Sequence, residues 1–127
     1  MSAVRGVVLD AGAFIALERR DRVMTELARR LAEDEIPLVT SAGVVAQVWR
    51  GGSRAPVPIA FLLRRTTVVD LTQRVAKVIG RMLGATRTKD PIDAHIVLLA
   101  RERGWTVLTS DPDDLRRIDP ALAVEAL

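Results

Sequence analysis

Short runs of apolar, β-branched residues alternate with longer stretches of helical periodicity along the whole chain, and this alternation constrains the fold more than any other feature. Strands are expected at residues 4–9, 37–39, 66–69, 105–108 and, as a weak edge strand, 123–126. Helices are expected between them, at residues 13–18, 22–34, 42–50, 58–65, 71–84, 91–103 and 112–117. Strands that alternate with helices over short connections indicate an α/β fold, with a small, mostly parallel sheet of four or five strands and helices on both faces.

No linker, low-complexity segment or internal repeat interrupts this pattern, so we expect residues 1–127 to form a single domain. The apolar run that precedes Asp10 is too short for a signal peptide or a membrane span. We therefore expect a cytoplasmic protein that does not associate with membranes.

Helical periodicity also predicts which side chains face the core. On the helices at 22–34 and 71–84, the inward positions are Val23, Leu27, Leu31, Val75, Val78, Ile79 and Leu83. Residues 57–63 are more apolar than a small surface helix requires, which leaves two interpretations, buried core or a groove for a partner helix. Trp49 is expected to pack in the core, with stacking on a nucleic-acid base as the alternative.

The composition limits the chemistry that the side chains can perform. The chain has no cysteine and no tyrosine, and its single histidine is His95, which excludes thiolate chemistry and any site that needs two imidazoles. His95 lies two residues after Asp93, so on a helix it faces a different side. Carboxylates, hydroxyls and amides remain, and these oxygen ligands favour hard metal ions. The formal net charge of +3 argues only weakly for a polyanionic partner.

Acidic residues follow the expected strands where a functional crevice would form. Asp10 ends the first strand, Asp111 follows the strand at 105–108, and Asp90 and Asp93 lie at the start of the helix at 91–103. In parallel sheets, the carboxyl ends of strands and the amino ends of the following helices share one edge, so we expect these four acids to converge.

Helix capping is the alternative explanation for most of these acids. The segments DPID at 90–93 and DPDD at 111–114 share a pattern, with Asp at the N-cap, Pro at the first helical position and acids in the first turn. This pattern explains Asp90 and Asp114 without any function. Asp10 fits capping less well, because an acid that ends a buried strand is costly unless it is hydrogen-bonded or bound to a cation.

Three segments together resemble the signature blocks of the PIN-domain nucleases: VVLDAGAFIAL at 7–17, DPIDAHI at 90–96 and VLTSDPDDL at 107–115. In length and order the chain is most similar to the VapC toxins of bacterial toxin–antitoxin pairs, over about residues 4–119. The resemblance implies a PIN-like fold and a metal-dependent ribonuclease. It implies that Asp10, Asp93 and Asp111 hold Mg²⁺ or Mn²⁺ and that Thr109 lies beside the last acid.

Gln47 departs from the family pattern, because the resemblance places a glutamate at this position. An amide oxygen can ligate a hard cation or orient a water, but it carries no charge. Gln47, Thr109, Asp90 and Asp114 are therefore expected to support the three acids. The competing hypothesis is a PIN-like module that binds RNA or protein and cleaves poorly. Glu18 is the first residue to check as a replacement acid, although it is nearly two helical turns away.

The resemblance also implies partners. These are an RNA substrate, a VapB-like antitoxin that covers the acidic site, and a second copy in a homodimer. Candidate contacts to RNA phosphates are the basic residues that flank the acidic segments: Arg50, Arg54, Arg87, Lys89, Arg116 and Arg117. Two other classes of protein that use an acidic site fit poorly. A haloacid-dehalogenase-type phosphatase needs an Asp where Gly12 stands, and a phospho-receiver would have to use Asp70 without an acidic pair after the first strand.

Overall fold

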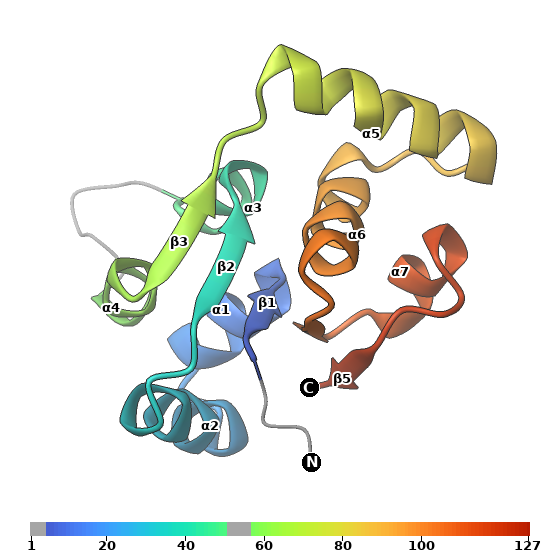
Figure 1. The fold of residues 1–127 in the computed structure, drawn as a ribbon. Helices are drawn as coiled ribbons and strands as arrows, with labels where there is room; N and C mark the ends of the chain where they lie inside the picture. Colours follow the sequence, from blue (N-terminus) through green and yellow to red (C-terminus); the bar gives the residue numbers. More distant parts are fainter. Residues whose placement is uncertain (1–4, 51–56) are drawn as a thin grey trace.

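The computed structural model describes residues 5–50 and 57–127, and five parallel strands form its centre (Figure 1). The strands are β1 (Val7–Leu9), β2 (Leu38–Ser41), β3 (Thr66–Val69), β4 (Thr106–Thr109) and β5 (Val124–Ala126). The helices are α1 (Ala11–Glu18), α2 (Arg22–Glu33), α3 (Ala42–Val48), α4 (Val57–Arg64), α5 (Gln73–Thr86), α6 (Pro91–Arg103) and α7 (Pro112–Ile118). All the expected elements are present; Val4, the expected first residue of β1, lies outside the described residues.

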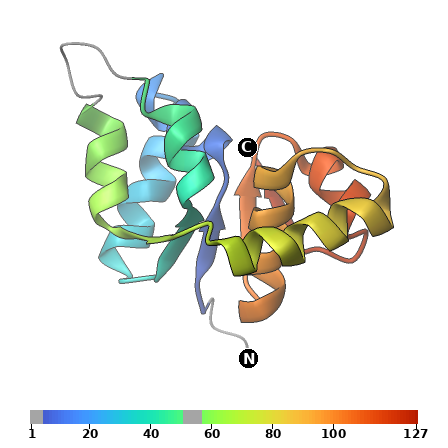
Figure 2. The ribbon, with the colours of Figure 1, turned by 90° about the horizontal axis from the view of Figure 1, so that it is seen from above.

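The strand order is β3-β2-β1-β4-β5, and every neighbouring pair is parallel. The chain therefore runs outward from β1 to β3, crosses back, and continues outward from β4 to β5. Because parallel crossovers are right-handed, this reversal puts α1–α4 on one face of the sheet and α5–α7 on the other. Figure 2 shows these two helical layers on either side of the strands. The expected α/β architecture with helices on both faces is confirmed.

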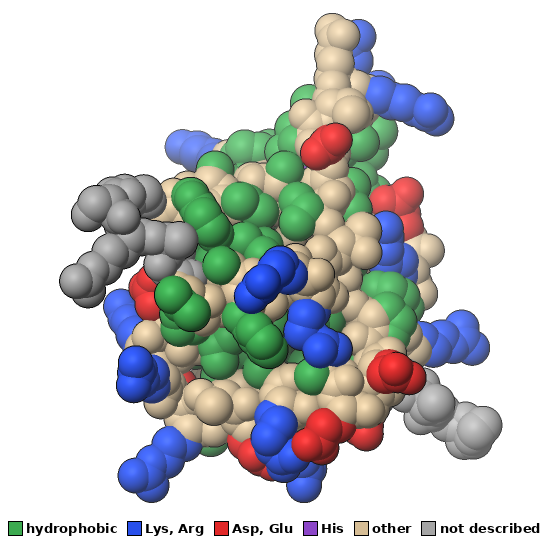
Figure 3. Space-filling view, turned by 90° about the vertical axis from the view of Figure 1, so that its left-hand side faces the viewer, with side chains coloured by type: hydrophobic (Ala, Val, Ile, Leu, Met, Phe, Trp, Pro, Cys, Tyr) green, Lys and Arg blue, Asp and Glu red, His purple; other side chains and the backbone are tan. Residues whose placement is uncertain are grey.

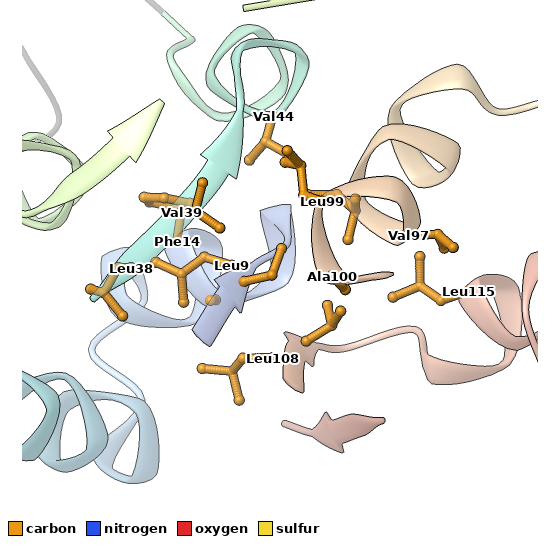
Figure 4. Packing of buried hydrophobic residues seen from close by; sticks show 14 of the residues in the cluster. Leu9, Phe14, Leu38, Val39, Val44, Val97, Leu99, Ala100, Leu108 and Leu115 are labelled. Atoms are coloured by element: carbon orange, nitrogen blue, oxygen red, sulfur yellow. The ribbon is translucent and has the colours of Figure 1, made fainter. Parts of the chain in front are cut away.

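The central strands are buried on both faces because helices cover each side. Val8 and Leu9 of β1 are inaccessible to solvent, and they belong to one core with Phe14 of α1 and Leu99 of α6 (Figure 4). This explains why β1 is a continuous apolar run and not an alternating one. A chain with so short a central strand relies on helices from both layers to complete the core.

The expected inward-facing residues are confirmed on α5 but not throughout α2. Val23 is 71% exposed, and Met24 is buried in its place. Met24, Leu27 and Leu31 have the spacing i, i+3, i+7, which is also a helical stripe, and the longer methionine side chain reaches the core. On α5 the expectation is confirmed for Ile79, which is fully buried, and for Val75 and Leu83, which are partly buried and pack against the core. The burial is incomplete because this helix lies at the outer side of its layer and packs mainly on α6.

The apolar segment that includes α4 is partly buried in the core and partly exposed. Ile59 and Leu62 are buried, whereas Val57 and Phe61 are exposed, Phe61 to 54%. Trp49 is 42% exposed, so the expectation that it packs in the core was wrong; it follows the last buried residue of α3 and remains at the rim. The resulting open hollow of about 550 Å³ is lined by Trp49, Val57, Ala60, Leu63 and Arg64.

Figure 3 shows hydrophobic side chains gathered on the face of the molecule that carries α4 and β3, with basic side chains among them. No helix within the described ranges has the length and apolar character that a bilayer crossing requires.

Candidate active site

The candidate site lies where β1 and β4 are neighbours, because this is the point at which the strand order reverses. Crevices form at such switch points, at the carboxyl ends of the strands, where connections leave in opposite directions. Asp10 directly follows β1, and Asp111 follows β4 by two residues. The structure therefore brings together two acids that are 101 positions apart in the chain.

Asp10 is only 7% exposed and is fixed by two hydrogen bonds. Its Oδ1 accepts from the backbone N–H of Ala11 at 2.8 Å, and its Oδ2 accepts from the hydroxyl of Thr109 at 2.9 Å. The Thr109 oxygen in turn accepts from the backbone N–H of Asp111 at 2.9 Å. Thr109 thus connects the carboxylate of Asp10 with the backbone of Asp111. This position agrees with the resemblance, which places Thr109 beside Asp111.

Burial raises the pKa of Asp10, the hydrogen bonds from Ala11 and Thr109 oppose this rise, and the charges of Asp111 and Asp90 add to it. Each carboxylate makes ionisation of its neighbours less favourable. The pattern shows that acids from the ends of β1 and β4 and from the start of α6 interact electrostatically.

A glycine allows α1 to approach the segment after β4. A Cβ atom at Gly12 would lie 2.9 Å from the backbone nitrogen of Ser110 and closer still to the Ser110 hydroxyl. No larger residue fits without a shift. Gly12 is therefore required for the close approach that places Asp10 beside Asp111, a role that the sequence pattern did not suggest.

Asp90 and Asp93 occupy the first turn of α6 but differ in environment. Asp90 is exposed and caps the helix, since its carboxylate accepts from the backbone N–H groups of Ile92 and Asp93 at 2.9 and 3.1 Å. Asp93 is half-buried, and within the described part of the chain its carboxylate has no hydrogen bond or ion pair. Burial, followed by the charges of Asp90, Asp10, Asp114 and Asp111, raises the pKa of Asp93 to about 7.

Asp111 corrects the expectation that both Asp-Pro segments cap their helices in the same way. It occupies the N-cap position of α7, but its side chain makes no capping hydrogen bond. Its φ of −127° and ψ of 65° differ from the extended N-cap geometry of Asp90. Asp114, in the first turn of α7, forms an exposed ion pair of 3.5 Å with Arg117. Capping therefore accounts for Asp90, whereas the carboxylate of Asp111 is unused by the helix.

The acids share one edge, but the expectation that four of them converge at a point was too strong. Among residues 5–50 and 57–127, no three acidic or histidine side chains are close enough together to ligate one ion. The donor set still fits a hard divalent cation in its chemistry, because all its members offer oxygen and two mutually repelling carboxylates, Asp93 and Asp111, lack a partner in the described chain. Glu18 is exposed at the far end of α1, which leaves it outside this group.

Gln47 lies on α3, whose first turn packs closely against the first turn of α6. A Cβ atom at Gly43 would be 2.8 Å from the Ile92 side chain. Gln47 is four residues after Gly43 and hence on the same face of α3. It is half-buried, and its backbone carbonyl accepts from Arg50 Nε at 3.1 Å.

His95 is buried and has a partner that the sequence did not reveal. Its Nδ1 lies 2.6 Å from the hydroxyl oxygen of Ser41, the residue that ends β2 and caps α3. The burial of His95 lowers its pKa and so favours the neutral form of the ring. Sequence reasoning assigned Ser41 only to capping, because nothing in a single sequence connects residues 54 positions apart.

Basic residues border the acids on the side of α7. Arg87, Lys89 and Arg117 line a hollow of about 340 Å³ together with Asp90, Asp93 and Asp114. Arg87 ends α5 in the left-handed conformation, with φ of 57°. Arg50 and Arg116 are exposed and do not line this hollow, and Arg54 lies outside the described residues. The structure thus groups three of the six expected RNA contacts beside the acids.

Solved structures with a similar fold include VapBC2 from Rickettsia felis bound to a promoter DNA fragment (TM-score 0.68, 17% identity, covering 95% of this chain and 98% of that one). They also include the Mycobacterium tuberculosis VapC20, a Sarcin-Ricin loop cleaving toxin (0.67, 21%, covering 93% and 97%). A third is FitAcB from Neisseria gonorrhoeae (0.62, 19%, covering 93% and 95%).

At these identities the similar structures establish the fold alone. The sequence finds no match among curated proteins. The model of the PIN domain family matches residues 7–120, which is nearly the whole chain and includes all the acids of the candidate site. The chain belongs to the PIN domain family.

Proposed function

We propose that residues 1–127 act as one PIN domain that hydrolyses RNA with the help of Mg²⁺ or Mn²⁺, as the toxin of a toxin–antitoxin pair. The observation that carries this function is the group of mutually repelling acids at the strand switch point, where Asp10 is buried and fixed while Asp93 and Asp111 have carboxylates unpaired within the described chain. Such a group is unfavourable on its own and suits a divalent cation. Among proteins of similar fold, one is described as a Sarcin-Ricin loop cleaving toxin.

Asp10, Asp93 and Asp111 would hold the ion between them, in part through bridging water molecules, because the three carboxylates are too far apart for all of them to ligate it directly. When bound, the ion would lower the pKa of a water molecule and offset the charge that develops on the phosphoryl oxygens. Thr109 orients the Asp10 carboxylate and the backbone of Asp111 through its two hydrogen bonds. Asp90 keeps the first turn of α6 intact through its capping bonds, and so fixes the backbone that carries Asp93.

Basic side chains would bind the RNA backbone next to the acids. Arg87, Lys89 and Arg117 border the hollow that contains Asp93, so phosphates could lie between the cationic rim and the bound ion. Arg117 also neutralises Asp114, which reduces the repulsion between this wall and an incoming phosphate. Arg50, Arg54 and Arg116 remain candidate contacts farther along the strand of RNA.

Gln47 is the feature that favours a second candidate function, a PIN module that binds RNA or protein and cleaves poorly. With glutamine at this position the site has one negative charge fewer than the glutamate would give. The two functions differ in one respect that can be measured, the rate of cleavage when metal is saturating.

We further propose a VapB-like antitoxin as the partner, a homodimer as the assembly, and the cytoplasm as the location. The apolar hollow beside α4, with exposed Trp49, Val57 and Phe61, is a surface suited to an amphipathic helix. VapBC2 and FitAcB, both similar in fold to this chain, support the antitoxin partner.

The decisive experiment compares the wild type with Asp10→Asn on structured and on single-stranded RNA, in Mg²⁺, in Mn²⁺ and in chelator. We expect cleavage by the wild type in either metal, none in chelator, and a loss of at least about 100-fold in the variant. Equal products from both proteins, or cleavage in chelator, would exclude the proposed reaction. Binding of RNA by the wild type without cleavage at saturating metal would support the binding module.

A further inference from the structure

The hydrogen bond between Ser41 and His95 joins the two helix starts that contribute to the candidate site. Ser41 ends β2 and caps α3, and His95 lies one turn into α6, two residues after Asp93. Both side chains are essentially inaccessible to solvent, at 0% and 1% exposure, and their 2.6 Å contact is a polar link between these elements. A buried polar pair of this kind fixes one arrangement, because separating it would leave both groups without partners.

The protons in this link can be assigned from the bonding capacity of each group. The Ser41 oxygen accepts from the backbone N–H of Gly43 at 3.0 Å, so its own hydrogen is available to donate. A neutral imidazole has one donor and one acceptor nitrogen. With the Ser41 hydroxyl donating to Nδ1 and the ring proton on Nε2, Ser41 and Nδ1 are both satisfied. The hydroxyl therefore caps α3 and binds α6 at the same time.

Close packing between α3 and α6 reinforces the link about one helical turn before His95 in the sequence. Gly43 leaves no space for a Cβ atom against Ile92, whose backbone N–H is in turn held by Asp90. The first turns of α3 and α6 thus meet through a polar contact at Ser41 and His95 and a van der Waals contact at Gly43 and Ile92. We name these four residues the α3–α6 joint.

We propose that His95 is a positioning residue of the candidate active site, which sets the separation between Asp93 on α6 and Gln47 on α3 through its hydrogen bond to Ser41. Asp93 is two residues before His95, and Gln47 is one turn after Gly43 on the face of α3 that meets α6. Neither residue needs to contact His95 directly. This role rests on the proposed function, since it is a role in holding the ion in place.

Three variants separate positioning from simple packing. His95→Leu keeps the apolar volume but removes the acceptor. His95→Asn restores an acceptor, because the asparagine Oδ1 takes the place of Nδ1. Val97→Ala is the matched control: it creates a cavity at a fully buried position of the same helix, on the side that lies toward Leu115 of α7 (Figure 4).

The first measurement is made without metal, by NMR hydrogen exchange of the α3 amides. We expect the Gly43 amide, which donates to Ser41, to exchange faster in His95→Leu than in wild type, and to be unchanged in Val97→Ala and His95→Asn. Equal exchange in His95→Leu and wild type would show that the bond does not hold α3, and would overturn the role. Because no metal or RNA is present, this result is independent of the proposed function.

The second measurement is Mn²⁺ affinity, by calorimetric titration of the same proteins. We expect His95→Leu to weaken binding about 10-fold, as loss of a residue that orients metal ligands typically does. His95→Asn and Val97→Ala should bind like wild type, even though Val97→Ala lowers the melting temperature. Unchanged Mn²⁺ affinity in a folded His95→Leu protein would show that the α3–α6 joint only packs the two helices together, and would overturn the positioning role of His95. Absence of Mn²⁺ binding by the wild type would instead refute the proposed function.

A second variant covers the case in which His95→Leu does not fold. Ser41→Ala removes the other half of the bond, and we expect the same order of loss in Mn²⁺ affinity. Where both single variants fold, the double variant should lose no more affinity than the more affected single one, because both changes break one interaction. Additive losses would show that the two residues act separately and would overturn the proposed link.

Discussion

Asp90 and Asp111 begin their helices with the same Asp-Pro sequence, but only Asp90 uses its carboxylate to cap the helix. The difference follows from what precedes each residue. The backbone N–H of Asp111 donates to Thr109, and this bond holds the turn after β4 in a conformation unlike an extended N-cap. Asp90 follows an exposed turn and is free to adopt the extended geometry. One carboxylate therefore contributes to stability, and the other remains available for binding.

This difference predicts opposite effects of two substitutions. Asp90→Ala should lower the free energy of unfolding by about 1 kcal/mol, the usual value of an N-cap. Asp111→Asn should leave stability unchanged or slightly higher, since it removes a charge from a repulsive group, and should abolish cleavage. Thermal unfolding and an RNA cleavage assay check both. Asp90→Asn is the control, since asparagine caps equally well; a loss of stability in it equal to that of Asp90→Ala would contradict the capping role.

The raised pKa of Asp93 predicts an unusual dependence of stability on pH. Its pKa rises to about 7 in the folded protein from an ordinary value of 3.8, so the folded state binds the extra proton between these pH values. Stability therefore falls as pH rises through this interval, and Asp10, whose pKa is also raised, adds a fall in the same direction.

The substitution Asp93→Asn removes the larger of these effects. In metal-free buffer at pH 8 it should raise the melting temperature by roughly 4 °C, which corresponds to on the order of 1 kcal/mol after allowance for solvent screening. At pH 4 the wild type and the variant should melt together. Melting curves across this range provide the measurement, with Asp34→Asn on the surface as a control. A variant that tracks the wild type at every pH would contradict the electrostatic origin of the shift.

At the scale of elements, two glycines control how closely helices approach the site. Gly12 brings α1 against Ser110, and Gly43 brings α3 against Ile92, whereas a Cβ atom at Gly80 of α5 would meet nothing within 4 Å among the described residues that pack around this helix. The same residue type thus has a packing role in two helices and none in the third. Its effect on stability when replaced should differ in sign accordingly.

Gly12→Ala should lower stability by about 1–3 kcal/mol, the usual cost of overpacking, and should weaken Mn²⁺ binding because α1 and the segment after β4 are forced apart. Gly80→Ala should raise stability by about 0.5–1 kcal/mol, since alanine favours a helix more than glycine does. Denaturant unfolding and metal titration measure both. Ser110→Gly combined with Gly12→Ala should recover part of the loss; no recovery would place the strain elsewhere.

The elements themselves could be predicted from sequence, since periodicity and β-branched runs identify strands and helices through local physics. The acids could also be placed at one edge, because parallel topology fixes where strands end. The links between them could not. Thr109 bonds Asp10 across 99 positions, and Ser41 bonds His95 across 54, and neither spacing leaves a local pattern. For the same reason the shared Asp-Pro pattern predicted the same capping geometry for Asp90 and Asp111.

At the scale of the whole molecule, the reversal of strand order gathers negative charge in a chain that is positively charged overall. The formal net charge is +3, yet the switch point contains Asp10, Asp90, Asp93, Asp111 and Asp114 within electrostatic reach of one another. The repulsion at this edge of the sheet is unfavourable, and the apolar core that the two helical layers form with the sheet offsets it. A divalent cation at this edge would therefore stabilise the entire folded state, because the unfolded chain disperses the same acids.

This linkage predicts that Mn²⁺ raises the melting temperature. At a concentration of about 100 times the dissociation constant, the stabilisation is about 2.7 kcal/mol, or roughly 10 °C. Asp10→Asn should lose this response, since Asp10 is the acid that the fold fixes most firmly, whereas Glu18→Gln should keep it.

Gln47→Glu should respond at lower Mn²⁺ concentrations and cleave RNA faster, because it adds a negative charge on the face of α3 that meets α6. An identical Mn²⁺ response in wild type, Asp10→Asn and Gln47→Glu would show that the ion binds elsewhere, since a cation held at the strand switch point must sense the charge of both residues.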